Sequence, residues 1–475
     1  MSVSTTNVKR SASGGVLVVG GGFGGVTVAR LLGRHGATIV NPQNSMLFTP
    51  MLPEVAAGVV EVRNVMTPIA MACPHADVIE GRVTALDLEH NRAAVTTDSG
   101  LHMSISYDHV VVAVGAVPRT LPVPGLVDHA VGCTSVLDAL YLRNQVLRQL
   151  AAAAVDPDPA RRRRHLTFVF VGGGYAGVEA LSELRDLAHD ALRYHPALAD
   201  VPQRWVLVDS APKILAEIPT RLGQYVYDLL LQRGVDIRLN TRLEKVADGR
   251  VSLSDGAEFD TGLLVWTAGV KADPVVGRLG LPLDERGRAR VTPTLQVEGR
   301  QNVWALGDCA AVPNQAADGR VDPPTSQHAL RQARQLVKNL NALEGGMPLA
   351  HYSFRSLGQV ATLGRKEGIA DIKGVRLRGL PGWLAARAVH LIQVPGASRR
   401  LGVVSDWALA LFFPPNMVTY AGLMEAPLID GSSGSPVSRP LRLPMPEGLL
   451  PGTGPEGTGP EETGSHGTGS QGTGE

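Results

Sequence analysis

Two glycine-rich turns are the features of this chain whose residue types and spacing point most directly to chemistry. Both follow the pattern G-x-G-x-x-G, the first at Gly20, Gly22 and Gly25, with Phe23 and Gly24 inside it, and the second at Gly172, Gly174 and Gly177. The first glycine of such a turn permits a tight bend, the second lets the backbone approach a pyrophosphate, and the third allows close packing of helix on strand. Because phosphates bind at the N-terminus of the helix that follows, each turn predicts a dinucleotide site.

The elements around the two turns repeat in the same order. Residues 16–19 and 166–171 are short apolar runs, typical of strands buried on both faces of a parallel sheet, and each leads into its glycine turn. A helical pattern follows each turn, and residues 37–40 and 205–208 then predict a second strand. The sequence therefore predicts an α/β protein with two Rossmann-like dinucleotide-binding domains.

The residue that ends the second strand of each unit helps to identify the nucleotide. Asp209 holds this place in the second unit, where a carboxylate accepts hydrogen bonds from ribose hydroxyls and repels a 2′-phosphate, so NADH is favoured over NADPH. Asn41 holds it in the first unit, either as a ribose ligand or as an ordinary turn residue before Pro42. Two dinucleotide sites in one chain suggest a tightly held FAD that faces a transient NADH.

Three further strand ends are candidates for contact with a cofactor. Apolar strands at 110–114 and 263–268 close on Gly115 and Gly269, which either let the backbone pass close to a cofactor or are plain strand-end glycines. A third apolar strand leads into Asp308. A lone Asp after a strand is often a helix cap, but beside two nucleotide units it is also a candidate ligand of the flavin ribityl chain.

Composition narrows the class of protein. A chain of 475 residues with a net charge of +1 is long enough for a large core and has no global charge signature for nucleic acid. Cys73, Cys133 and Cys309 support neither a disulfide framework nor a metal site, and they suit a reducing compartment. The polar N-terminus is not a signal peptide, and no uncharged apolar run reaches the roughly 18 residues of a membrane span. Any membrane contact is therefore expected to be peripheral.

Composition changes in the C-terminal part of the chain. Residues 372–405 contain six arginines or lysines and no acid, and residues 381–393 and 405–413 predict helices rich in large apolar side chains. Arg387 and His390 are expected on faces of the first helix other than its apolar one. This region is either a docking surface for anionic lipids or a helical region that packs on the protein itself.

Two other segments are expected to carry no chemistry. Residues 151–164 combine an Ala run with four consecutive arginines and predict a solvated linker. Residues 431–475 consist mainly of Gly, Pro, Thr and Ser with scattered Glu, a composition typical of disorder.

Several collinear motifs resemble the type II NADH dehydrogenases, single-chain FAD enzymes that pass electrons from NADH to a membrane quinone. Besides the two glycine turns, the resemblance rests on residues 47–56 (LFTPMLPEVA), 265–270 (VWTAGV), 307–308 (GD), 324–329 (PTSQHA) and 358–365 (GQVATLGR). It extends from about Val16 to Tyr420, most of the part expected to fold.

The resemblance implies contacts between individual residues and FAD. Thr49 and Pro50 would lie against the flavin ring, and Val83 would meet the adenine through its backbone. Asp308 would bond the ribityl chain.

The resemblance also implies which residues take part in reduction of the quinone. Glu179 would face the space between nicotinamide, flavin and quinone, although the helix dipole stabilises an acid at that position in any case. Gln327 and Gln332 match the glutamines of the quinone-site motif, and a capping or surface amide is the alternative for Gln327. Ser326 and Arg331 depart from that motif.

These inferences combine into one predicted architecture. The fold class is α/β, with two Rossmann-like domains for FAD and NADH and a C-terminal membrane-associating region. The expected boundaries are 14–125 with 295–345 for FAD, 126–294 for NADH, 346–430 for membrane docking, and disordered ends at 1–13 and 431–475.

The predicted function is hydride transfer from NADH to FAD and two-electron reduction of a membrane quinone, without proton pumping, at the cytoplasmic face of the cell membrane. Expected partners are NADH, a membrane quinone and anionic lipids but not nucleic acid, and a homodimer is left open. Two alternatives remain, a soluble NAD(P)H-dependent flavoprotein reductase with a non-quinone acceptor and a non-enzymatic FAD-binding sensor. Sulfide chemistry is disfavoured because no two cysteines have a redox spacing.

Overall fold

The computed structural model describes residues 10–11, 15–33, 36–420, 425–427 and 438–440. The two ends predicted to be disordered, 1–13 and 431–475, lie almost entirely outside these residues. Within the described part, no helix combines the length and the apolar content that crossing a bilayer requires.

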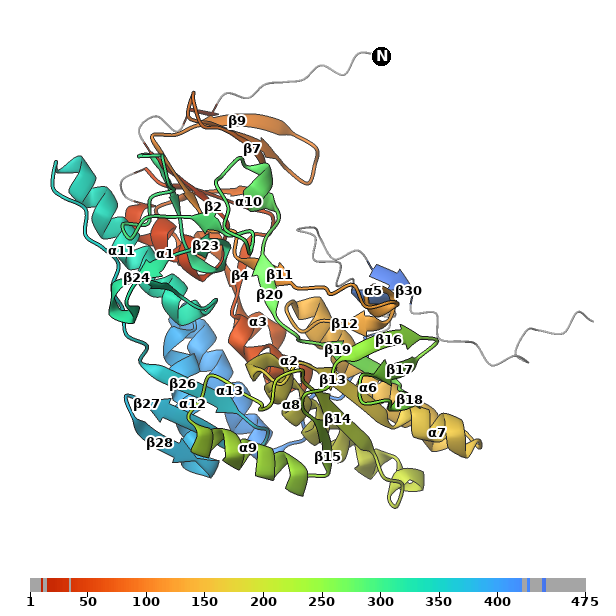
Figure 1. Ribbon diagram of the computed structural model, residues 1–475. Coiled ribbons are helices and arrows are strands. Elements are labelled where there is room, and N and C mark those ends of the chain that lie inside the picture. Colours follow the sequence, from red (N-terminus) through yellow and green to blue (C-terminus); the bar gives the residue numbers. More distant parts are fainter. Residues whose placement is uncertain (1–9, 12–14, 34–35, 421–424, 428–437, 441–475) are drawn as a thin grey trace, which may run out of the picture. The chain divides into compact units, whose positions relative to one another are not determined.

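The first glycine turn lies at the end of a strand in a five-stranded parallel sheet. In spatial order the strands are β22 (Val303–Ala305), β10 (His109–Val112), β2 (Val16–Val19), β3 (Thr38–Asn41) and β6 (Asp77–Glu80). Helix α1 (Phe23–Leu32) begins directly after the turn and packs against α11 (Ser326–Glu344), which returns from far along the chain (Figure 1). Every residue of β2 is buried, as its uniformly apolar sequence predicts.

The second glycine turn has the same setting in a second five-stranded parallel sheet. Its strands, in spatial order, are β12 (Ala130–Val131), β19 (Leu263–Trp266), β13 (Thr167–Val171), β14 (Arg204–Val208) and β15 (Val235–Arg238). Helices α6 (Val136–Val155), α8 (Tyr175–Ala191) and α9 (Thr220–Gln232) accompany this sheet (Figure 1). The two predicted mononucleotide units are thus confirmed, each with strand, glycine turn, helix and parallel strand in order.

A mainly antiparallel layer accompanies each parallel sheet. The first consists of β7 (Arg82–Asp87), β8 (Arg92–Thr96) and β9 (His102–Ser106), with β1 (Arg10–Ser11) paired in parallel at its edge, and the second of β16 (Leu243–Ala247), β17 (Arg250–Leu253) and β18 (Glu258–Asp260). An antiparallel pair of β11 (Ala116–Pro118) and β20 (Val270–Ala272) joins the two units. The glycines just before these strands, Gly115 and Gly269, have φ values of +76° and +96°, so the backbone conformation itself favours glycine at both turns.

The predicted linker at 151–164 is helical instead. Helix α6 continues to Val155, and a short helix α7 (Pro159–His165) follows. Asp158 caps α7 by accepting a hydrogen bond from the backbone N–H of Ala160 at 2.7 Å, with proline at the first helical position. Asp156 pairs with Arg161, the first residue of the arginine run, at 3.0 Å, and this ion pair helps a solvated helix to accommodate the run. The composition of the segment alone did not indicate a helix.

The C-terminal region forms its own layer. Strands β26 (Gly358–Thr362), β27 (Gly368–Ile372) and β28 (Val375–Arg378) make an antiparallel sheet, followed by helices α12 (Gly379–Gln393) and α13 (Ala397–Phe412) (Figure 1). The first predicted helix is confirmed, but the second begins eight residues earlier than predicted, so Ser405 lies inside α13 and does not cap it. Val394 and Val403 belong to the apolar core that also holds side chains of α2 (Leu52–Ala56) and α8.

Short elements complete the described chain. They are β4 (Ser45–Leu47), α3 (Val62–Val65), β5 (Met66–Pro68), α4 (Ile69–Ala72), α5 (Leu126–His129), α10 (Val275–Arg278), β21 (Ala289–Arg290), β23 (Ala310–Ala311), β24 (Pro313–Asn314), β25 (Arg320–Val321), β29 (Glu425–Pro427) and β30 (Ser438–Pro440).

Candidate functional site

The two glycine turns have nearly identical geometry. Gly20 has a φ of +109° and Gly172 a φ of +119°, and a Cβ atom on either would lie within 2.6 Å of the backbone that follows β10 or β19. A Cβ on Gly25 would lie 1.9 Å from the carbonyl oxygen of Gly20, and one on Gly177 would lie 1.9 Å from that of Gly172. The first and third glycines of both turns are therefore required by the backbone itself.

The middle glycine of each turn differs from the other two. Neither Gly22 nor Gly174 has any atom within 4 Å of the position that a Cβ would take. Each is also the N-cap of the helix that follows, α1 or α8, and caps it without a side chain. The backbone is therefore bare where a phosphate would approach the helix N-terminus, so both turns fit the pyrophosphate of a dinucleotide.

Asn41 and Asp209 occupy matching positions but differ in the kind of hydrogen bond that they have left. Asn41 Oδ1 accepts from the Gly21 N–H at 2.7 Å and its Nδ2 donates to the Gln43 carbonyl at 2.7 Å, so the amide retains one acceptor position and one donor. Asp209 accepts from the backbone N–H groups of Gly173 and Ala211. A carboxylate has about four acceptor positions, so Asp209 retains capacity for ribose hydroxyls.

One cavity of about 1970 Å³ connects the first unit, α8 and the C-terminal region. The predicted site residues that line it are Gly22, Phe23, Gly24, Asn41, Thr49, Pro50, Gly115, Glu179, Asp308 and Gln327. The remaining ones do not line it: Gly20, Gly25, Val83, Gly172, Gly174, Gly177, Asp209, Gly269 and Gln332. Val83 is 5% exposed in β7, with its side chain in the apolar core, and its backbone contact with adenine stays a prediction.

Asp308 lies in the turn after β22, where its side chain is half-buried. Desolvation raises its pKa to about 6, and no hydrogen bond to its carboxyl group is present among the described residues. A partly buried acceptor without a donor is unfavourable, and the hydroxyls of a ribityl chain are donors of the right kind. The carboxyl group therefore fits the predicted FAD contact.

Glu179 lies in the first turns of α8, on the wall between the cavity and β26. Its Oε1 accepts from the backbone N–H of Thr362 at 2.9 Å, and its side chain is buried. Burial raises the pKa of Glu179 to about 8, a rise that the Thr362 hydrogen bond opposes and nearby Glu54 reinforces. The group is therefore protonated at neutral pH and carries a proton at the cavity wall.

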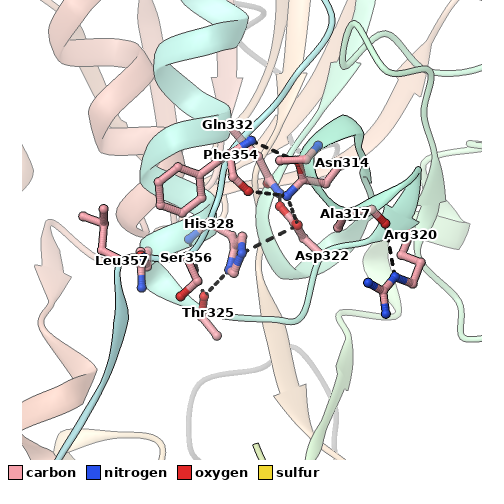
Figure 2. A network of polar contacts seen from close by, with 12 residues as sticks. Asn314, Ala317, Arg320, Asp322, Thr325, His328, Gln332, Phe354, Ser356 and Leu357 are labelled. Atoms are coloured by element: carbon pink, nitrogen blue, oxygen red, sulfur yellow. Dashed lines mark hydrogen bonds and ion pairs between the residues drawn. The ribbon is translucent and has the colours of Figure 1, made fainter. Parts of the chain in front are cut away.

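Gln332 supports the turn that holds Asp308 and does not reach the large cavity. Its Oε1 accepts from the Gly307 N–H at 2.8 Å, and its Nε2 donates to Asp322 at 3.0 Å. Asp322 also accepts from Asn314 at 2.8 Å and lies 3.6 Å from the His328 ring, as Figure 2 shows. These two hydrogen bonds make Gln332 a support of the Gly307 turn, and its role toward a quinone stays a prediction.

Gln327 connects α11 to the start of the C-terminal sheet. Its Oε1 accepts from the Leu357 N–H at 2.8 Å, and its Nε2 donates to the Gly358 carbonyl at 3.3 Å. It lines the same cavity as the predicted flavin contacts, and its amide holds the chain that leads into β26.

Two residues of α12 that were expected on its other faces are turned into the protein. His390 lines the cavity edge-on to Phe48, with ring centres 6.3 Å apart, and burial lowers its pKa to about 4. Arg387 is 8% exposed, stacks over Trp383 at 3.8 Å and pairs with Glu54 at 3.0 Å. The four-residue spacing of the Trp and the Arg was the available signal for this stacking.

Sequence reasoning also missed a set of cations around the cavity. No carboxylate within salt-bridge distance accompanies any of these side chains in the described part of the chain: Arg30, Arg320, Arg331 and Arg334. Unpaired guanidinium groups suit the two negative charges of a pyrophosphate. Contact between α1 and α11 brings Arg30 close to Arg331 and Arg334, and Arg320 comes from β25.

The fold and the cavity together define a two-dinucleotide α/β protein of the kind that binds a flavin. Residues 14–333 match the pyridine nucleotide-disulphide oxidoreductase family, and the chain belongs to that family.

Individual relatives show which proteins this chain resembles within and beyond the family model. A probable NADH dehydrogenase of Dictyostelium discoideum is 29% identical over 84% of this chain and 89% of its own length. The type II NADH:quinone oxidoreductase NdhA of Mycobacterium tuberculosis is 29% identical, with 84% and 88% covered. The fold also matches the structure of NDH2 from Plasmodium falciparum in complex with NADH, at a TM-score of 0.79 and 16% identity, over 85% of this chain and 99% of that one.

Proposed function

We propose that this protein is a flavin-dependent NADH:quinone oxidoreductase. The observation that carries the proposal is the single cavity, because it joins the bare glycine turn at Gly22, the predicted flavin contacts Thr49 and Pro50, and the protonated Glu179 of the second unit. The similarity over most of their length to proteins named NADH dehydrogenase and NADH:quinone oxidoreductase supports the same reading.

Separate residues of the chain would bind FAD, bind NADH and supply a proton. FAD, when bound, accepts two electrons from NADH and passes them to the second substrate. Gly22 and the arginines around the cavity would hold its pyrophosphate, and Asp308 its ribityl chain. Asp209 and Gly174 would bind NADH at the second turn. Glu179 would hold a proton next to the substrate that is reduced, since quinone reduction consumes protons.

Sulfur chemistry fits the site less well. Cys133 lines the cavity, but its thiol is buried, and burial raises its pKa to about 12. The thiolate is the reactive form of cysteine, and this environment suppresses it. Cys73 and Cys309 are buried as well and carry raised pKa values for the same reason.

We further propose that α12 and α13 dock on an anionic membrane at the cytoplasmic face. One side of this helix pair packs on the apolar core, whereas the other exposes large apolar side chains: Leu384, Ile392, Leu401, Val404, Leu409, Leu411, Phe412 and Phe413. Contiguous exposed apolar side chains next to basic residues such as Arg399 and Arg400 are typical of an interfacial segment.

The activity is tested with the purified, FAD-loaded full chain. NADH oxidation is measured with a short-chain quinone, with ferricyanide and without acceptor, and bleaching of the flavin by NADH is followed under anaerobic conditions. We expect NADH to bleach the flavin and quinone to restore its colour. A flavin that NADH does not bleach would contradict the proposal.

Membrane docking is tested by flotation with anionic vesicles. A double variant with Phe412→Ser and Phe413→Ser is expected to lose flotation while it keeps activity with a soluble quinone. The matched control carries Val155→Ser and Leu231→Ser, which remove exposed apolar side chains elsewhere on the protein. Equal flotation of both double variants would contradict docking through this face.

A further inference from the structure

Helix α8 carries four acids along one face. Glu179, Glu183, Asp186 and Asp190 follow one another at spacings of four, three and four residues, which places them on the same side of an α-helix. At 1.5 Å per residue, the backbone rise from Glu179 to Glu183 is about 6 Å. Glu179 lines the cavity, Glu183 is 4% exposed, and the Asp186 side chain is 24% exposed. The face therefore leads from the cavity wall to solvent.

Glu183 is the member of this face whose buried position is not explained by its contacts. Its Oε1 is buried without a hydrogen-bond partner. Burial raises its pKa well above the ordinary value, with further contributions from Glu54, Asp186 and Glu179 against the opposing charge of Arg387. A buried carboxyl group with an unsatisfied oxygen is costly, so its presence needs an explanation.

Arg387, the cation that acts on Glu183 among the described residues, is already paired with another acid. Arg387 of α12 pairs with Glu54 Oε1 at 3.0 Å, and the other oxygen of Glu54 accepts from the Trp407 indole N–H at 3.0 Å. Trp383 and Trp407 cover the Arg387 guanidinium at 3.8 and 4.6 Å. Arg387 and Trp407 thus both contact Glu54, whereas Glu183 Oε1 has no hydrogen-bond donor.

The two ends of the acid face differ in what surrounds them. Glu179 faces Thr362 of β26, Glu54 of α2 and the Cys133 thiol that precedes α6. Asp186 accepts from the Arg365 backbone N–H at 2.7 Å and lies 3.7 Å from the Arg185 guanidinium.

Asp190 ends the series. It pairs with Arg365 at 2.6 Å and with Arg193 at 3.3 Å. Both ion pairs occupy the Asp190 side chain, which leaves Asp186 as the outermost acid of the face for exchange of protons with water.

The proposed reaction needs such a route. Reduction of a quinone to a quinol takes two electrons and two protons, while the hydride of NADH brings both electrons and only one proton. One further proton must come from solvent in each turnover, and Glu179 itself is only 7% exposed.

We propose that Glu183 and Asp186 return this proton to Glu179, with Asp186 taking it from water and Glu183 passing it one helical turn along α8. One proton enters at Asp186 for each proton that leaves Glu179 for the quinone oxygen, and no electron moves along the route. A rise of about 6 Å between the two glutamates suits transfer through one bridging water. The inference rests on the proposed function and adds two positioning residues to it.

The test compares Glu183→Gln with Asp228→Asn, which removes an acid from the outer helix α9. Both FAD-loaded full-length variants are assayed with a short-chain quinone and with ferricyanide, whose reduction consumes no proton. We expect Glu183→Gln to lower kcat for quinone on the order of 10- to 100-fold, with the quinone KM and the ferricyanide rate unchanged. Glu183→Asp and added azide should each restore part of the quinone rate, and the solvent isotope effect should rise in Glu183→Gln alone.

A second variant keeps the test decisive if Glu183→Gln fails to fold. Asp186→Asn, at the exposed end, should lower the quinone rate several-fold and spare the ferricyanide rate. Quinone and ferricyanide rates that fall together, or a quinone rate that does not change in either variant, would overturn the relay. Wild-type protein that reduces ferricyanide but no quinone would instead overturn the proposed function, and the relay with it.

Discussion

The two dinucleotide units share a backbone plan and differ in what their first helix carries. Seven residues after the first glycine, α1 has Thr27, whose hydroxyl donates to the Phe23 carbonyl at 2.7 Å, whereas α8 has Glu179 with a pKa raised to about 8. Helix α1 buries mainly apolar side chains against β2 and α11, while α8 buries three acids, Glu179, Glu183 and Asp190. The same backbone plan thus supplies one helix without buried acids and one with a row of them.

The third glycines are the sharpest way to separate the roles of the two units. A methyl group on Gly25 or Gly177 would lie 1.9 Å from a carbonyl oxygen, and overpacking of this kind costs about 1–3 kcal/mol. Gly25→Ala should purify with about 10-fold less flavin or worse, since 1.4 kcal/mol is a factor of ten in binding. Gly177→Ala should keep its flavin, measured by absorbance, but resist bleaching by NADH.

The control for both glycine variants is Gly223→Ala, where the new methyl group has no atom closer than 3.8 Å. It should retain both flavin and bleaching. Loss of flavin in Gly177→Ala with full flavin in Gly25→Ala would reverse the assignment of the two sites.

Removal of the Glu179 carboxyl group tests whether α8, unlike α1, supplies a proton for quinone reduction. The protonated form exists below a pKa of about 8, so kcat with quinone should fall as pH rises through that value. Glu179→Gln should lower kcat by about 100-fold and remove this decline, because the amide cannot titrate. Thr27→Val, at the matching position of α1, should keep the decline. A Glu179→Gln profile that still breaks near pH 8 would assign the break to another group.

Nucleotide choice is expected to depend on the acid at the end of β14. Asp209→Ala should reduce the ratio of kcat/KM for NADH over NADPH by about 10-fold, because repulsion of a 2′-phosphate is lost. Asn41→Ala should leave this ratio unchanged, since Asn41 belongs to the other unit. An unchanged ratio in Asp209→Ala would remove the nicotinamide assignment from the second turn.

The smallest effect is expected in the stability of the FAD-free protein. Burial raises the folded pKa of Asp308 to about 6 from an ordinary value of 3.8, so the folded state binds the proton more tightly than the unfolded state. The free energy of unfolding should therefore fall as pH rises between those values. Asp308→Asn should remove this fall and stabilise the FAD-free protein at pH 7 by about 1–3 kcal/mol. Thermal unfolding of the wild type and of Asp308→Asn at acid and neutral pH measures this difference in stability. Equal pH dependence in the two proteins would show that Asp308 does not cause the fall in stability.

Much of the fold could be predicted because its signals are local. The uniformly apolar β2, the mostly apolar β13, the glycines with positive φ and the acid after β14 each reflect a constraint that acts over a few residues. The helical linker and the early start of α13 were missed for the opposite reason. Alanine and arginine runs are compatible with helix or coil, and Ser405 has the composition of a cap whether or not the helix continues through it.

The candidate site could be predicted only in part. Gln332 matches a motif, yet its amide is consumed by Gly307 and Asp322, contacts that depend on how α11 meets the turn after β22. His390 and Arg387 belong to a helix with apolar residues on more than one face, and its own sequence did not show which side meets α2.

The sequence by itself determined the two glycine turns, their strands and the position of the acid after β14, because backbone sterics and strand burial depend on neighbouring residues. Tertiary structure decided where protons can be held. The raised pKa values of Glu179 and Glu183 arise from removal of water by α2, β26 and α12, which are distant in the chain. Desolvation is a property of the assembled surroundings, and for that reason the same residue type is an ordinary acid on a surface and a proton carrier on the inner face of α8.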